Sequence, residues 1–230
     1  MLEKVRAIGP TTKRDDYETL QEWVYQELRQ SIITGRFLPG RNMTLRGVAE
    51  ALNTSPMPVR DAFGRLVAER ALATVGKGRV TIPRMSQDKL EELCGARVAL
   101  ETLAAERALP HIDGRRLRTL RKIDSGIDQA LQGGDIETLL IKNHQFHFTL
   151  YGATPSQVLL PMIESLWLQL GPFMRTALAR IGISYLTDRH VEAMDAIKRR
   201  DARALRDAIE ADIRDGIGSV REDELRGALE

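Results

Sequence analysis

The chain has 230 residues, of which 43% are hydrophobic and 29% are charged, a composition typical of a globular protein with one large or two ordinary domains. It has no apolar run of bilayer length, no apolar signal-peptide core near its N-terminus, and a single cysteine, Cys94. These features exclude membrane-spanning and disulfide-framework classes and favour a cytoplasmic protein that makes no membrane contact.

The net charge of +2 is unevenly distributed along the chain. Residues 1–83 carry 13 Lys/Arg and 9 Asp/Glu, whereas residues 84–230 carry 21 and 23. If the protein binds a polyanion, we expect the contact in the first part, although ordinary scatter of surface charge would give the same numbers.

The first part is predicted to be a small module over residues 16–83, preceded by a flexible tail at residues 1–15. Apolar residues at helical spacing predict a first helix from Asp16 to Gly35 and a short second helix after Thr44. A third helix is expected to begin at Ser55, with prolines in its first turn. Residues 71–83 predict a β-hairpin whose tip, residues 76–79, is basic.

The remainder of the chain, residues 84–230, reads as helical throughout. Pro, Gly and Asp breaks divide it into six helices near residues 86–109, 113–132, 135–152, 155–180, 188–200 and 201–224. The predicted fold is therefore mainly α, with an N-terminal winged helix-turn-helix of three helices and a β-hairpin wing, followed by an all-α six-helix bundle.

A short helix, a tight turn and a second helix with an outward basic face form the helix-turn-helix layout, in which the second helix enters the DNA major groove. Its rigid start would hold Arg60 toward a base edge, where a bidentate contact to guanine is worth about 1–3 kcal/mol of discrimination. Lys77 and Arg79 would reach phosphates or the minor groove. The alternatives are a surface ion pair of Arg60 with Asp61 or Glu69 and a charged hairpin tip that binds nothing.

The segments "GRFLPGRNMTLRGVAEAL" and "SPMPVRDA" resemble the winged-helix signature of GntR-type transcription regulators. "LEELCGARVALETLAAERAL" resembles the first helix of the ligand-sensing FCD-type domain in the FadR branch of that family. The resemblance implies DNA contacts at Arg46, Ser55, Arg60 and the wing residues Lys77, Gly78 and Arg79. The family usually has Arg-Thr after the serine, but this chain has Pro56-Met57, so we expect Met57 to contact a thymine methyl instead.

Asn143 and His147, four residues apart on one helix face, precede His190 and Asp212 further along the chain. Many members of the resembling family hold a divalent metal through Asp-x-x-x-His, a second His and a third His about twenty-two residues later. The matching positions here are Asn143, His147, His190 and Asp212, a set that suits Zn²⁺, Ni²⁺ or Mn²⁺. A metal-free hydrogen-bonded pocket is the alternative, and His144 is expected to be a surface or packing residue.

The resemblance also implies a homodimer that binds a double-stranded DNA operator and is released from it by a small organic acid in the bundle. Arg97 would assist in holding that acid, unless it only pairs with Glu101 one turn away, and Arg175 is a second candidate clamp. No organic cofactor is expected. The first alternative is a metal-dependent enzyme that acts on a small organic acid through the two-His, one-carboxylate site, and the second is a structural helical protein.

Overall fold

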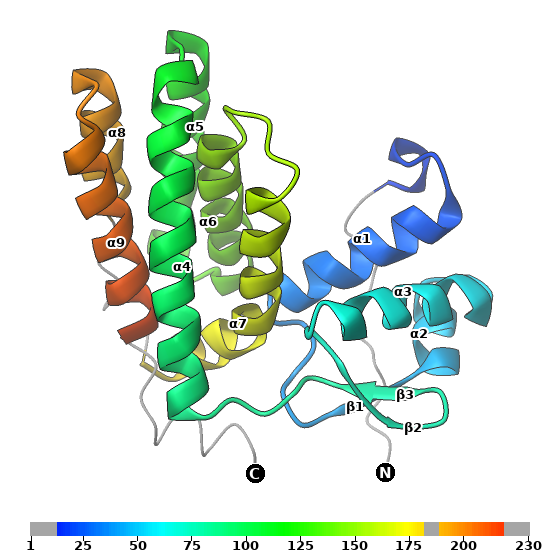
Figure 1. Ribbon diagram of the computed structural model, residues 1–230. Coiled ribbons are helices and arrows are strands. Elements are labelled where there is room, and N and C mark those ends of the chain that lie inside the picture. The colour runs from blue at the N-terminus through cyan, green and yellow to red at the C-terminus, as the bar shows by residue number, and fades with distance from the viewer. Residues whose placement is uncertain (1–12, 182–188, 219–230) are drawn as a thin grey trace.

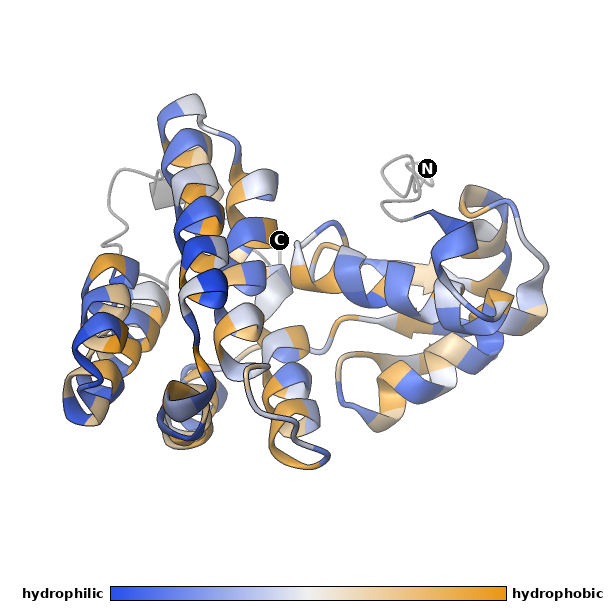
Figure 2. Ribbon diagram, turned by 90° about the horizontal axis from the view of Figure 1, so that it is seen from above, coloured by the Kyte–Doolittle hydropathy of each residue, from blue (hydrophilic) through white to orange (hydrophobic). Residues whose placement is uncertain are grey.

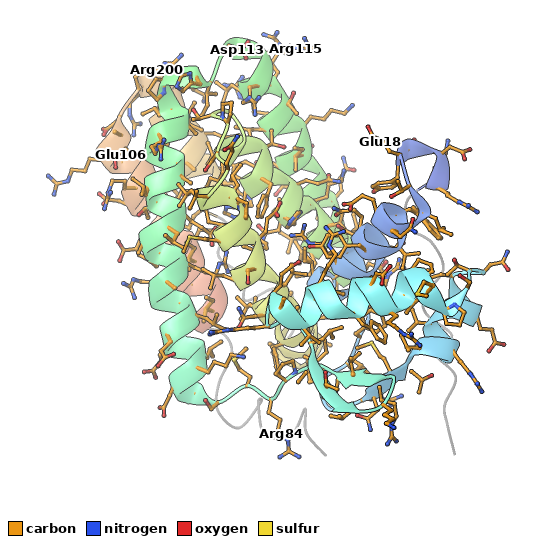
Figure 3. The ribbon with its side chains drawn as sticks, turned by 45° about the vertical axis from the view of Figure 1, so that its right-hand side comes forward. Glu18, Arg84, Glu106, Asp113, Arg115 and Arg200 are labelled. Atoms are coloured by element: carbon orange, nitrogen blue, oxygen red, sulfur yellow. The ribbon has the colours of Figure 1, made fainter. Side chains whose placement is uncertain are left out.

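The computed structural model describes residues 13–181 and 189–218, which form a small winged-helix part and a helical bundle (Figures 1 and 3). The winged-helix part has three helices and a three-stranded antiparallel sheet of order β1-β3-β2. Its elements are α1 (Leu20–Ile33), β1 (Asn42–Thr44), α2 (Leu45–Ala51), α3 (Pro56–Ala68), β2 (Ala73–Gly76) and β3 (Arg79–Thr81).

The bundle contributes six more helices among the described residues and confirms the predicted mainly α fold. They are α4 (Gln87–Ala108), α5 (Gly114–Gly133), α6 (Ile136–Tyr151), α7 (Leu159–Ile181), α8 (His190–Arg199) and α9 (Ala202–Gly218). A short 3-10 turn, Leu109–His111, follows α4. Each of these helices is too short or too polar to cross a membrane, as are the helices of the winged-helix part that the structure describes.

Polar side chains at the helix starts explain most of the helix boundaries. Thr19, Thr44, Ser86 and Asp113 each accept a hydrogen bond from a backbone N–H in the first turn of the helix that follows, at 2.7–3.2 Å. Such caps satisfy amides that have no partner inside the helix and are typically worth about 1 kcal/mol each. Gly134, with φ +70°, ends α5 in the left-handed conformation that favours glycine.

Several predicted boundaries were wrong. Because Thr19 is the cap, α1 begins at Leu20 instead of Asp16, and Arg14–Asp16 forms a separate 3-10 turn. The segment before Leu159 is not helical, so α7 begins four residues later than predicted. No strand was predicted at β1, which has three residues and one buried side chain. Residues 1–12 of the expected tail and 219–224 of the last helix lie outside the described residues.

The two parts meet where the C-terminal end of α1 reaches α7 (Figures 1 and 2). Buried hydrophobic side chains of both parts form one contiguous core, which includes Leu28 and Ile32 of α1 and Ile163 and Leu168 of α7. Burying an aliphatic side chain of this size stabilises the fold by about 1.5–3 kcal/mol. The winged-helix part is therefore packed on the bundle instead of being joined to it by the linker alone.

Candidate functional site

A groove of about 570 Å³ runs between α3 and the β2–β3 hairpin, which is the wing. Arg60 lines it from α3, and Lys77, Gly78 and Arg79 line it from the wing. Its lining also includes the buried apolar side chains of Phe63 from α3 and Val80 from β3. The fold thus brings four of the predicted DNA-contacting residues to one surface.

Arg60 and Arg65 both project from α3, but only Arg60 remains available for a ligand. Arg65 donates to Glu22 at 2.8 Å, and its guanidinium lies 3.3 Å from the centre of the Tyr25 ring. Arg60 is exposed and makes no ion pair with any residue that the structure describes. The alternative partner Glu69 instead accepts a hydrogen bond from Tyr25.

The remaining predicted DNA contacts lie at the N-terminal ends of α2 and α3. Arg46 is exposed in the first turn of α2, and Met57 is 58% exposed in the first turn of α3. Ser55 occupies the N-cap position of α3, but its side chain accepts no hydrogen bond from that helix, contrary to the expected cap. Its hydroxyl is therefore exposed and available to an external group.

Glycine is required at the wing tip. Gly78 has φ +68°, and its carbonyl accepts a hydrogen bond from the Leu45 amide at 3.1 Å. A Cβ at this position would lie 3.2 Å from the Leu45 side chain. The tip is thus tied to the start of α2, which fixes the position of Lys77 and Arg79 beside α3.

Inside the bundle, His147 of α6, His190 of α8 and Asp212 of α9 converge on one point. The two Nε2 atoms are 3.4 Å apart, and Asp212 Oδ2 lies 3.1 Å from His147 Nε2. Ligand atoms of all three residues lie within 4.8 Å of one another. The family resemblance implied these three residues as metal ligands, and the fold brings them together from three different helices.

The opposite nitrogen of each imidazole has its own partner. His190 Nδ1 lies 3.2 Å from the buried carboxylate of Asp124 on α5, a residue that the sequence analysis missed. His147 Nδ1 lies 2.9 Å from the Tyr151 hydroxyl, which donates to Glu101 at 2.9 Å. The tautomer that fits these partners has its proton on Nδ1 of each ring, so that the Nε2 atoms face Asp212 with their lone pairs.

Two imidazoles and a carboxylate that face one another suit a shared cation. Burial raises the pKa of the Asp212 carboxyl, but its interaction with His147 and the nearby charges of His190 and Arg97 outweigh burial, so the pKa is below its ordinary value. Glu101 is paired with Arg97, and the carboxylate of Asp124 is paired with His190. The donor set therefore fits a divalent transition metal whose histidines are oriented by carboxylate and phenol partners.

Asn143 lies one turn before His147 and lines a cavity of about 90 Å³ beside this cluster. Arg97 and Asp212 line the same cavity, together with largely aliphatic side chains from α1, α5, α6, α7 and α9. His144 is turned away from the predicted ligand set and stacks on Phe148, with ring centres 4.3 Å apart. It is a packing residue, as predicted.

Arg97 makes its alternative ion pair as well as lining the cavity. Its Nε and Nη2 groups donate to Glu101 at 2.5 and 3.3 Å, and its guanidinium lies over the Trp167 ring. Trp167 and Tyr151 also donate to Glu101, so that carboxylate is fully satisfied. Arg97 Nη1 makes no hydrogen bond to a described residue and is the part of the side chain that a ligand could use.

Arg175 does not line this cavity, so the structure corrects its prediction as an effector clamp. It lies where the two parts meet and donates to the Glu137 carboxylate and to the Thr34 carbonyl, both at 3.2 Å. Arg36 also pairs with Glu137. Burial raises the pKa of Glu137, but the two arginines outweigh it and lower the pKa below the ordinary 4.5. Arg175 reaches α1 because Gly171, one turn earlier on α7, lets the two helices approach each other closely.

Comparisons with known proteins agree with both parts of this arrangement. The family described as "Bacterial regulatory proteins, gntR family" matches residues 20–82, and the FCD domain family matches residues 92–215. The chain belongs to the GntR-family regulators that carry an FCD domain. These matches confirm the resemblance that the sequence motifs indicated.

Individual relatives are consistent with this family. The HTH-type transcriptional regulator McbR of Escherichia coli (strain K12) is 28% identical over 201 residues, 86% of this chain and 90% of McbR. The solved McbR/YncC structure superposes with a TM-score of 0.83 at 26% identity, covering 88% and 97% of the two chains. The gluconate operon transcriptional repressor of Bacillus subtilis (strain 168) is 28% identical over 79% of this chain and 76% of that protein.

The family and these relatives are transcription regulators and not enzymes. The alternative in which the His147–His190–Asp212 cluster is the active site of a metal-dependent enzyme is therefore rejected. The cluster therefore has to be understood as part of a regulator.

Proposed function

We propose that this protein is a homodimeric, ligand-responsive repressor that binds a pseudo-palindromic DNA operator through α3 and the wing. The observation that carries the proposal is the groove in which Arg60, Lys77 and Arg79 converge, while the neighbouring Arg65 is committed to Glu22 and Tyr25. Arginine and lysine side chains on both walls suit a phosphate backbone and the base edges of one groove. Two copies related by a twofold axis would match two half-sites.

The test compares two arginines on one helix. Arg60→Ala should abolish a footprint on the DNA upstream of the protein's own gene, whereas Arg65→Ala should retain it, because Arg65 is held by intramolecular partners. Size-exclusion chromatography with light scattering checks that both variants keep the oligomeric state of the parent. Equal footprints for Arg60→Ala and the parent would remove Arg60 from base recognition.

We propose that His147, His190 and Asp212 hold a divalent metal, with the Asn143 amide oxygen as a fourth ligand. The convergence of the two Nε2 atoms on Asp212 and the partners of both Nδ1 atoms support this assignment. A bound divalent cation would supply the positive charge that attracts the carboxylate of an acidic effector. The Zn²⁺, Ni²⁺ and Mn²⁺ ions all accept this combination of imidazole and oxygen ligands.

Elemental analysis of the purified protein tests the metal directly. The parent should contain about one divalent ion per chain, and the double variant His147→Ala, His190→Ala should contain none. His144→Ala is the matched control, because this histidine stacks on Phe148 outside the proposed ligand set. Stoichiometric metal in the double variant would place the metal elsewhere in the chain.

The effector is proposed to be a small organic acid that binds in the cavity beside the metal cluster and releases the operator. The cavity is lined by Arg97 and Asn143, both of which offer N–H donors, and by Ile33 from α1. Release requires that the acid bind one arrangement of the DNA-binding parts more tightly than the other. Relatives named as repressors, such as the gluconate operon repressor, support repression as the default state.

A further inference from the structure

We propose that the effector is a short aliphatic monocarboxylate and that Ile33, a residue of the DNA-binding part, sets the length of its chain. This inference rests on the proposed effector function of the cavity beside the metal cluster. It follows from three features of that cavity: its polarity changes along its length, its volume is small, and one wall comes from α1.

The lining changes from polar to aliphatic with distance from the histidine pair. On α6, His147 is followed toward the N-terminus by Asn143 and then, one further turn away, by Leu139. On α9, Asp212 lies near the histidines, and Gly216 and Ile217, about one turn further along the cavity, carry no polar side chain. Because residues three or four positions apart lie on one side of a helix, the cavity-facing sides of α6 and α9 both become apolar away from the histidines. One end of the cavity is therefore polar and the other is aliphatic.

The polar end can hold a single carboxylate. Arg97 Nη1 has no hydrogen bond within the described residues, and the Asn143 side chain offers an amide N–H. No second cationic side chain lines the cavity among the residues that the structure describes. A dicarboxylate would therefore place its second charge among aliphatic side chains, where an unpaired carboxylate is strongly disfavoured.

The size of the aliphatic end limits the chain of the ligand. The cavity has about 90 Å³ of free volume, less than the roughly 150 Å³ of an apolar cavity that accepts benzene. A carboxylate with a chain of about three to five carbons fits a cavity of this volume. A polyhydroxylated acid does not, because its hydroxyl groups would lose their water partners against leucine and isoleucine side chains.

Ile33 closes the cavity from the DNA-binding side. It is the last residue of α1, it is 5% exposed, and its backbone lies against Gly171 of α7, where no side chain intervenes. The same helix packs on α3, which carries Arg60. A ligand chain that fills the aliphatic end would thus touch the DNA-binding part itself, and the size of the Ile33 side chain would decide how long that chain can be.

Calorimetric titration of the full-length protein with sodium salts of acetate, propionate, butyrate, valerate, hexanoate and gluconate, with and without Zn²⁺, tests the proposal. We expect the tightest binding at three to five carbons and at least tenfold weaker binding of hexanoate and gluconate. Ile33→Ala should increase the affinity for hexanoate, relative to the affinity for butyrate, at least tenfold. Leu20→Ala, at the opposite end of α1 and outside the cavity lining, should leave the chain-length order unchanged.

Footprinting of the same samples separates failure of this inference from failure of the proposed function. A normal footprint combined with gluconate binding more tightly than butyrate, or with no carboxylate binding at all, overturns the inference and leaves the regulator intact. An unchanged chain-length order in Ile33→Ala overturns the role of Ile33. If that variant does not fold, Ile33→Val should raise the affinity for hexanoate relative to butyrate by a smaller factor. An unchanged order of affinities in the valine variant would likewise overturn the role of Ile33.

Discussion

Replacing Gly171 with alanine should force the DNA-binding part away from the bundle. A Cβ at this position would lie 2.5 Å from the Ile33 carbonyl oxygen, 2.7 Å from its Cα and 2.9 Å from its carbonyl carbon. All three are backbone atoms, so no side-chain rotation can relieve the overlap. Ordinary van der Waals contact begins at 3.4 Å, which requires the end of α1 to move by about 0.9 Å relative to α7.

The size of the effect follows from two opposing contributions. Overpacking of this kind costs about 1–3 kcal/mol, while alanine stabilises a helix interior by about 1 kcal/mol relative to glycine. Gly95→Ala in α4 isolates the second contribution, because nothing lies within 4 Å of the added carbon. Gly171→Ala should therefore be about 1–3 kcal/mol less stable than Gly95→Ala, and for a chain of this size 1 kcal/mol corresponds to about 2–4 °C in Tm.

Scanning calorimetry gives the stability difference, and hydrogen exchange locates it. In Gly171→Ala the amides of residues 30–36, at the end of α1, should exchange faster than in Gly95→Ala, while those of α5 and α6 should be unaffected. Operator affinity and effector response should change only in the Gly171 variant. Equal Tm values and equal exchange in the two variants would show that α1 does not rest on α7 as described.

Three further outcomes are expected. Lys77→Ala should weaken operator binding similarly for different sequences and reduce the slope of log K against log salt by about one, as measured by fluorescence anisotropy; an unchanged slope would deny it a phosphate contact. Asp124→Asn should lower metal affinity about 10–100-fold in a chelator competition, because it orients His190; equal affinity would make Asp124 irrelevant to the cluster. The ion pairs of Glu137 stabilise the fold fully above the unfolded carboxyl pKa, near 4.5, and are lost as pH falls through the lower folded pKa. Glu137→Gln should therefore cost about 1 kcal/mol at pH 7 in urea denaturation, and this difference should shrink as the pH falls below 4.5. A difference that stays constant at low pH would contradict the assignment.

Sequence patterns predicted local features well and long-range partners poorly. Helical periodicity and capping residues are local signals, so the three helices of the winged-helix part and the six of the bundle were found with errors at their ends. Exposure at one helix face could not distinguish Arg60 from Arg65, because the difference depends on Glu22 and Tyr25 in another helix. The strand β1 was missed because it forms only by pairing with β3.

The same contrast between local features and long-range partners applies to the residues in and around the cavity. Spacing along the chain, read through a family resemblance, selected His147, His190 and Asp212, but Asp124 has no such spacing and is recognisable only from its contact with His190. Arg175 illustrates the opposite error, since a cation beyond Pro172 looked like a ligand clamp and instead binds Glu137 and Thr34.

Gly171 determines how closely α1 approaches α7 near both Ile33 and Arg175. Without a side chain at Gly171, the end of α1 comes close enough for Ile33 to enter the cavity and for Arg175 to reach the Thr34 carbonyl. The residues that hold the two parts together and the residues that line the cavity are thus adjacent on α7. Under the proposed effector function, contacts of the ligand with Ile33 would bias the position of α1, because Ile33 packs against Gly171 where the two parts meet.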